Sequence, residues 1–136
     1  MKKLLLLITL FTLFVACKKE TNKKDECGCN GIIQYTIPDA EPLYGSLSYK
    51  IQLDSLDDFY NNKFWFGYTV PNCINCVHAY ILCNEDFLSD TLKSKLVSGE
   101  IIQVKFSGYV TETCQKTFAP ADYTYNRLIL TKIEEK

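Results

Sequence analysis

Residues 84–99, NEDFLSDTLKSKLVSG, decide the fold that the sequence predicts. Within this stretch the apolar residues recur every fourth position, as on one face of a helix, whereas the flanking stretches alternate apolar and polar residues as strands do. Asn84 suits the N-cap and Gly99 suits the position after the helix end. The shared face would carry three leucines, Leu88, Leu92 and Leu96. The sequence therefore predicts one helix within a chain of strands.

Six predicted strands surround this helix. Four precede it and two follow it, over residues 32–37, 46–53, 63–70, 77–83, 101–110 and 125–133. The clearest strand is 46–53, in which Leu47, Tyr49, Ile51 and Leu53 alternate with polar residues. Gly108 permits a bend or β-bulge in the fifth strand.

Five of these strands, with the helix between the third and fourth of the five, match the connectivity of an OB-fold. Closing the sheet also removes exposed strand edges. We therefore predict a mainly β fold, a small OB-like antiparallel barrel of five to six strands with one helix between the third and fourth barrel strands. An open antiparallel sandwich with a helix across one end shares nearly all local predictions and is the alternative.

The first 17 residues, MKKLLLLITLFTLFVAC, predict where the protein works. Two lysines precede an apolar run, residues 4–16, that is shorter than the roughly 20 residues of a membrane-spanning helix. The small Ala16 before Cys17 is typical of a signal cleavage site. With a cysteine at the cut, the stretch resembles a bacterial lipoprotein signal, which implies a lipid on Cys17. Ordinary cleaved secretion and a structural element are the alternatives.

The predicted organisation is a signal peptide over residues 1–16, a lipid anchor and flexible tether over 17–29, and the barrel domain over 30–136. Residues 18–26, KKETNKKDE, lack apolar side chains and cannot offset the entropy of ordering. No acidic residue directly follows Cys17, which by the sorting rule of bacterial lipoproteins favours the outer membrane. We expect an envelope protein, attached to the membrane through lipidated Cys17, on the periplasmic or surface face.

Seven cysteines are unusual for a reducing compartment, whereas exported proteins keep disulfides. With Cys17 assigned to lipid, an even six remain, which allow 15 connectivities. We expect a bridge between Cys83 and Cys114. Of the other four, we expect Cys27 and Cys29 each to form a disulfide with one of Cys73 and Cys76.

The motif Cys73–Cys76, CINC, permits four interpretations, of which a structural disulfide is favoured. A thiol–disulfide oxidoreductase needs a helix after the pair, but residues 77–83 are typical of a strand. Haem attachment needs a histidine where Val77 stands, and His78 comes one position late. A zinc site would combine the four thiolates Cys27, Cys29, Cys73 and Cys76. No metal and no cofactor are predicted.

Residues 64–68, FWFGY, contain the candidate ligand contact Trp65. Alternation places Phe64, Phe66 and Tyr68 on one face and Trp65 on the other. Trp65 would either stack on a ligand, as aromatic residues of OB-type barrels do, or pack under a loop, which we favour.

His78 is the single histidine and a second candidate contact, with no partner that would make it catalytic. We therefore predict no enzyme.

Charge argues against a nucleic-acid partner, because residues 30–136 carry 9 basic and 13 acidic side chains and show no basic stripe. An envelope protein or a glycan remains as the partner.

Five segments, residues 44–49, 64–68, 81–84, 104–110 and 128–133, resemble small lipoproteins of the Bacteroidota type. The resemblance covers residues 44–133 and lies in strand residues, not in a catalytic signature. It implies a small OB-like β-barrel of uncharacterised role and supplies no active site.

These observations predict a lipid-anchored envelope protein that acts as a binding or accessory module. One alternative is a periplasmic thiol–disulfide protein that uses Cys73 and Cys76. Another is a glycan-binding surface protein that uses Trp65.

Overall fold

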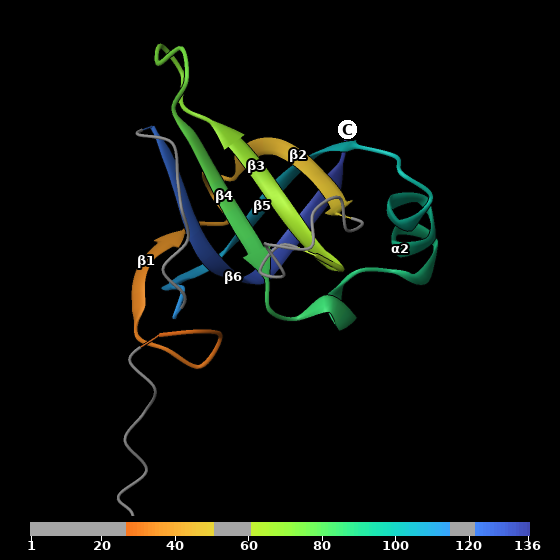
Figure 1. Ribbon diagram of the computed structural model, residues 1–136, viewed down its shortest axis with the longest axis horizontal. Coiled ribbons are helices and arrows are strands. Elements are labelled where there is room, and N and C mark those ends of the chain that lie inside the picture. The colour runs from red at the N-terminus through yellow and green to blue at the C-terminus, as the bar shows by residue number, and fades with distance from the viewer. Residues whose placement is uncertain (1–26, 51–60, 115–121) are drawn as a thin grey trace, which may run out of the picture.

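A computed structural model describes residues 27–50, 61–114 and 122–136. Its elements are β1 (Ile33–Ile37), β2 (Leu43–Lys50), β3 (Lys63–Thr69), β4 (Val77–Leu82), the 3₁₀ turn η2 (Glu85–Phe87), α2 (Asp90–Val97), β5 (Ile102–Glu112) and β6 (Tyr123–Glu135) (Figure 1). Within these ranges, no helix is long and apolar enough to cross a membrane. The predicted strand residues Ile51 and Leu53 lie outside the described residues.

Five strands close into a barrel, in the order β5-β2-β3-β4-β6 and back to β5. All neighbouring pairs are antiparallel except β4 and β6, which run parallel. Helix α2 lies between β4 and β5, which are the third and fourth barrel strands in chain order. The predicted OB-like barrel and the position of its helix are confirmed.

The sixth strand, β1, lengthens one wall of the barrel. Along one edge of β5, β1 pairs with residues 108–111 and β2 with residues 102–106, so the two strands lie end to end. Pro38 and Pro42 stand in the break between them. Proline has no backbone N–H for the ladder, so the chain leaves the sheet here as a loop.

A β-bulge lies beside this break. In the β5–β6 ladder, Ser107 is opposite Lys132 and Gly108 is opposite Leu130, so Thr131 is an extra residue on β6. A Cβ at Gly108 would overlap the carbonyl oxygen of Ile129. The ladder is thus irregular at Gly108, as predicted, but the extra residue lies on β6 and not on the fifth strand, where the bend or bulge was expected.

The barrel interior is an aromatic and aliphatic core. Phe106 lies at its centre, with its ring centroid 4.6 Å from that of Phe66 and 5.8 Å from that of Tyr80. All three side chains are buried. The three predicted helix-face leucines are buried in the same cluster, Leu88, Leu92 and Leu96.

The helix is shorter than the predicted residues 84–99. Ser89 is its N-cap, accepting a hydrogen bond from Leu92 N at 3.2 Å, and Gly99 follows its end with a φ of +100°. Asn84 instead pairs with β6. Its Nδ2 donates to Leu130 O at 2.9 Å, and Leu130 N donates to its Oδ1 at 2.8 Å. An amide side chain thus continues the strand pairing where β4 ends, which explains why Asn84 is not the cap.

Candidate functional site

The six cysteines of the described chain form three disulfides, Cys27–Cys114, Cys29–Cys83 and Cys73–Cys76, with Cα atoms 5.1, 5.5 and 5.4 Å apart. The predicted pairings, Cys83 with Cys114 and the two close pairs with each other, are wrong. Cys17 lies outside the described residues.

The reason is that the N-terminal segment lies along the end of β5. Gly28 N donates to Glu112 O at 2.7 Å, and Thr111 Oγ1 donates to Gly28 O at 2.7 Å. These bonds bring Cys27 to Cys114, which follows β5. Both cysteines assigned to the tether, Cys27 and Cys29, are therefore bonded to the barrel.

The Cys73–Cys76 disulfide closes the tip of the β3–β4 hairpin. Val70 N donates to Cys76 O at 3.0 Å, Cys73 N donates to Val70 O at 3.2 Å, and β4 begins at the next residue, Val77. A strand and not a helix directly follows this pair, so the helix N-terminus that lowers a thiol pKa in oxidoreductases does not lie beside it.

The four thiolates proposed for zinc do not come together. Two of them belong to the bridges Cys27–Cys114 and Cys29–Cys83, and the other two are bonded to each other. Across the described residues, no group of three histidine, cysteine, aspartate or glutamate side chains could hold a metal ion.

Trp65 and His78, the two predicted ligand contacts, lie on opposite faces of the β3–β4 hairpin. In this ladder Trp65 is opposite Ile81, whereas Tyr68 is opposite His78. Successive side chains alternate between the faces of a strand. His78 thus shares the inner face with buried Tyr80, and Trp65 points outward, so one ligand would not reach both.

Trp65 is half-buried on the outer face of β3. It packs, together with Tyr125 of β6, against Ile81 of β4, which is fully buried. Trp65 also lines a small hollow of about 70 Å³ with Lys50, Tyr123 and Tyr125. The ring centroids of the two tyrosines are 6.4 Å apart. Three aromatic residues and Lys50 therefore line this Trp65 hollow.

His78 ends the row of aromatic side chains inside the barrel. Its ring centroid lies 6.0 Å from that of Tyr68 and 6.3 Å from that of Tyr80. The parallel pairing of β4 with β6 places His78 opposite Thr124, and its Nδ1 is hydrogen-bonded to Thr124 Oγ1. These contacts hold the imidazole half-buried in the barrel wall.

Tyr80 is the buried member of the same row. Tyr35 Oη donates a hydrogen bond to Tyr80 Oη at 3.1 Å. Burial, and then the contact with Tyr35, raises the pKa of Tyr80 above its usual range. The phenol therefore stays protonated and neutral at physiological pH, so it offers no phenolate nucleophile.

Tyr123 and Tyr125 are not among the ligand contacts that the sequence predicts. Their pattern, aromatic residues two apart at the start of β6, is visible in the sequence as Tyr-Thr-Tyr. Their position beside Trp65 is not visible, because it depends on the parallel pairing of β6 with β4.

The chain matches no protein-family model and no curated protein. The class of protein that the structure defines is a disulfide-bonded OB-like β-barrel with an aromatic hollow on its outer face.

Proposed function

We propose that the protein is a non-enzymatic, lipid-anchored binding module of the bacterial cell envelope, which takes its ligand at the Trp65 hollow. The observation that carries the proposal is the position of this hollow. Trp65 and Ile81 belong to β3 and β4, the second and third barrel strands. The face formed by these two strands is where OB-folds bind oligosaccharides and oligonucleotides.

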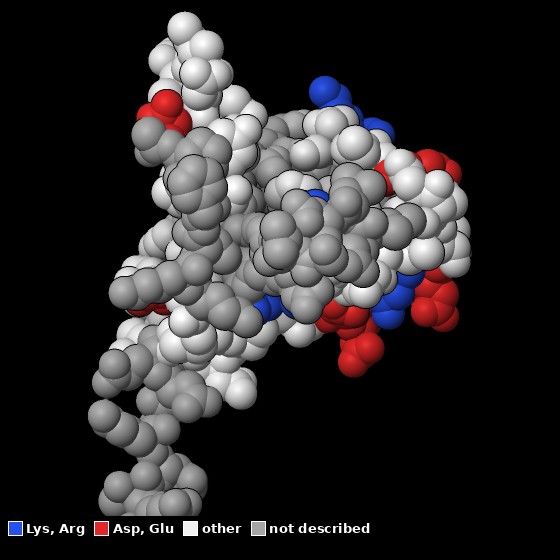
Figure 2. All heavy atoms as spheres, viewed as in Figure 1, with Lys and Arg blue, Asp and Glu red and all other residues white. Residues whose placement is uncertain are grey.

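A glycan is the ligand that the chemistry of the hollow supports. Aromatic faces such as those of Trp65, Tyr123 and Tyr125 pack against the C–H groups of sugar rings, while Lys50 offers hydrogen-bond donors. Affinity for nucleic acid would need many phosphate contacts. On the described surface in Figure 2, the basic side chains stand apart with acidic ones between them, not in a stripe.

The disulfides support one orientation on the membrane. Nine residues separate Cys17 from Cys27, and Cys27 is bonded to the barrel. In Figure 1 the start of the described chain and the tip of the β3–β4 hairpin lie at opposite ends of the molecule. A lipid on Cys17 would hold the Cys27 end nearer the membrane and direct the hairpin tip away. The absence of an acidic residue directly after Cys17 supports the outer membrane as the location.

The thiol–disulfide alternative receives less support. Cys73 and Cys76 lie in a hairpin loop without a helix N-terminus beside them, so nothing in the described geometry activates either thiol.

The anchor is tested by substituting Cys17. We expect Cys17→Ser to abolish incorporation of a clickable fatty acid in cells and to move the protein out of the membrane fraction. A matched control is the double variant Cys73→Ser/Cys76→Ser, which should keep the label. Labelling of Cys17→Ser at the wild-type level would contradict the proposed anchor.

The hollow is tested by fluorescence, because Trp65 is the single tryptophan of the chain. We expect an envelope or host polysaccharide to shift its emission, and Tyr123→Ala to weaken that binding about tenfold through loss of an exposed ring. Tyr44→Ala, which removes an exposed tyrosine from β2, should leave it unchanged. The glycan would be contradicted if no polysaccharide shifts the emission. A protein partner would take its place if the wild type then captures one membrane protein and Tyr123→Ala does not.

A further inference from the structure

A second hollow lies on the opposite half of β6, between β1, β5 and the loop after β1. Its volume is about 340 Å³, and its lining residues are Thr36, Ile37, Pro38, Asp39, Tyr109 and Thr131. None of them lines the Trp65 hollow. We call this second site the Tyr109 hollow.

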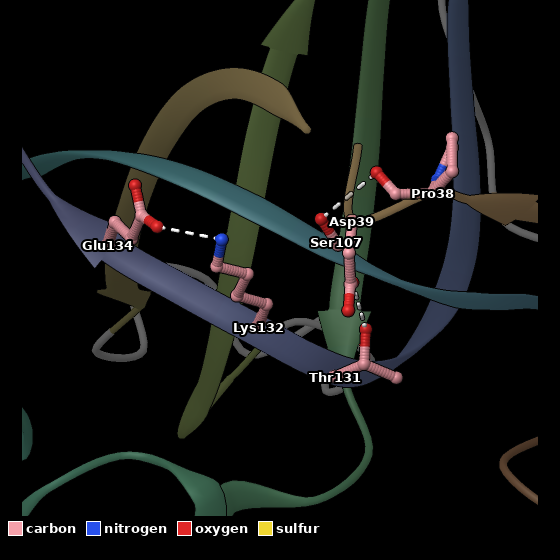
Figure 3. Close-up of polar contacts among 6 residues, drawn as sticks. All are labelled: Pro38, Asp39, Ser107, Thr131, Lys132 and Glu134. Carbon is pink, nitrogen blue, oxygen red and sulfur yellow. Dashed lines mark hydrogen bonds and ion pairs between the residues drawn. The ribbon is translucent and has the colours of Figure 1, made fainter. Parts of the chain in front are cut away.

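Two irregularities of the sheet build the Tyr109 hollow. The break between β1 and β2 places Asp39 in a loop, and the bulge in β6 makes Thr131 an extra residue beside that loop. Thr131 Oγ1 donates to Asp39 Oδ1 at 3.1 Å, and Ser107 Oγ donates to Pro38 O at 3.3 Å. Figure 3 shows both bonds, which join the loop to β6 and β5. The loop is thus held in place before any ligand arrives, which lowers the entropy cost of binding.

The lining combines an aromatic ring with several polar groups. Tyr109 is 41% exposed and stands opposite Thr36 in the β1–β5 ladder. Hydroxyls of Thr36, Tyr109 and Thr131 both donate and accept, and the Asp39 carboxylate accepts. A ring surface beside a few fixed polar groups suits a ligand with an apolar face and hydroxyls at its rim.

The charges around the hollow disfavour an anionic ligand, because Asp39 is its single charged lining residue. Lys132 follows Thr131 in β6, and its ammonium group donates to Glu134 Oε1 at 2.9 Å (Figure 3). The three hydroxyls of the lining favour a ligand with several hydroxyls of its own, because each can donate to or accept from such a group.

We propose that the Tyr109 hollow binds a neutral sugar, with the sugar ring against Tyr109 and its hydroxyls hydrogen-bonded to Asp39, Thr36 and Thr131. Ile129, the register partner of Tyr109, lines a further hollow of about 370 Å³ with Cys29, Asn30, Gly31 and Ile33. This inference goes beyond the Trp65 hollow and does not depend on it.

The test is calorimetric titration of the full chain, purified in an amine-oxide detergent so that no detergent sugar competes. The probes are neutral tetrasaccharides of glucose, mannose, galactose and N-acetylglucosamine, with glucosamine and tetramethylammonium chloride as cationic probes. We expect at least one tetrasaccharide to bind. Tyr109→Ala should weaken that binding about tenfold by removing the ring.

Asp39→Asn is the second variant. Its amide oxygen can still accept the Thr131 hydrogen bond, so the loop stays in place while the charged acceptor for sugar hydroxyls is lost. We expect Asp39→Asn to weaken tetrasaccharide binding by about threefold or more. Tyr44→Ala is the matched control and should leave the affinity unchanged. Trp65→Phe is a third variant, which reports any sugar that binds at the Trp65 hollow.

Three outcomes would overturn the proposal: no tetrasaccharide binds, binding is unaffected by Tyr109→Ala and Asp39→Asn, or the cationic probes bind more tightly than the sugars. Sugar binding that Trp65→Phe abolishes while Tyr109→Ala does not would assign the sugar to the Trp65 hollow instead. The variants thereby distinguish whether the Tyr109 hollow or the Trp65 hollow does not bind sugar. Thermal unfolding of each variant confirms that an observed loss arises in a folded protein.

Discussion

Replacing Cys27 and Cys114 together by serine is expected to lower the free energy of unfolding by about 3.8 kcal/mol. The Cys29–Cys83 bridge remains in this variant, so the Cys27–Cys114 bridge closes a loop of about 35 residues, through residues 27–29 and 83–114. In the chain-entropy description, a disulfide removes conformational freedom from the unfolded state, and the effect grows with the logarithm of the loop length. A loss of this size is a large part of the stability of a small domain.

The matched control is the double variant Cys73→Ser/Cys76→Ser. This bridge spans a separation of 3 residues, and the same relation gives about 2 kcal/mol for it. Urea unfolding of the wild type and both variants, under oxidising conditions, measures the difference. Equal losses in the two variants would show that loop length does not set the contribution of these bridges.

Phe106→Ala is expected to lower the free energy of unfolding by about 4 kcal/mol. Phe106 is fully buried between Phe66 and Tyr80, and it stands on β5, which pairs with β1, β2 and β6. Its removal would leave a cavity at the centre of the barrel, in addition to the lost transfer of the ring from water.

Phe87→Ala is the matched control, because Phe87 is 45% exposed in the turn η2. Its effect should stay within about 0.5 kcal/mol, as for most surface substitutions. The shift in the urea midpoint at constant slope measures both variants. A shift for Phe87→Ala as large as that for Phe106→Ala would contradict the placement of the core around Phe106.

Most of the fold was predictable because it depends on local patterns. Alternation identified strands 46–53 and 101–110, and β-branched or aromatic content indicated strands 32–37 and 63–70. The four-residue spacing of the leucines identified the buried helix face, and Gly108 indicated the irregular point of the β5–β6 ladder. The N-cap was misassigned to Asn84 because several side chains in this stretch can cap a helix, Asn84 and Ser89 among them. Only the approach of Leu130 to the end of β4 decides which of them does so.

The candidate site was less predictable, because each part of it joins residues that are distant in sequence. Trp65 meets Tyr125 through the parallel pairing of β4 and β6. Asp39 meets Thr131 across 92 positions, and only because a strand break and a bulge coincide. Neither coincidence leaves a periodic signal in the sequence.

The sequence by itself determined the strands, the helix, the core-facing residues and the expectation of a lipid-bearing Cys17, since these depend on the period and composition of neighbouring residues. The tertiary structure decided the cysteine partners, the opposite faces of Trp65 and His78, and the Tyr109 hollow. The physical reason is the closure of the barrel. Closure sets the register between strands, and register determines which distant side chains come into contact.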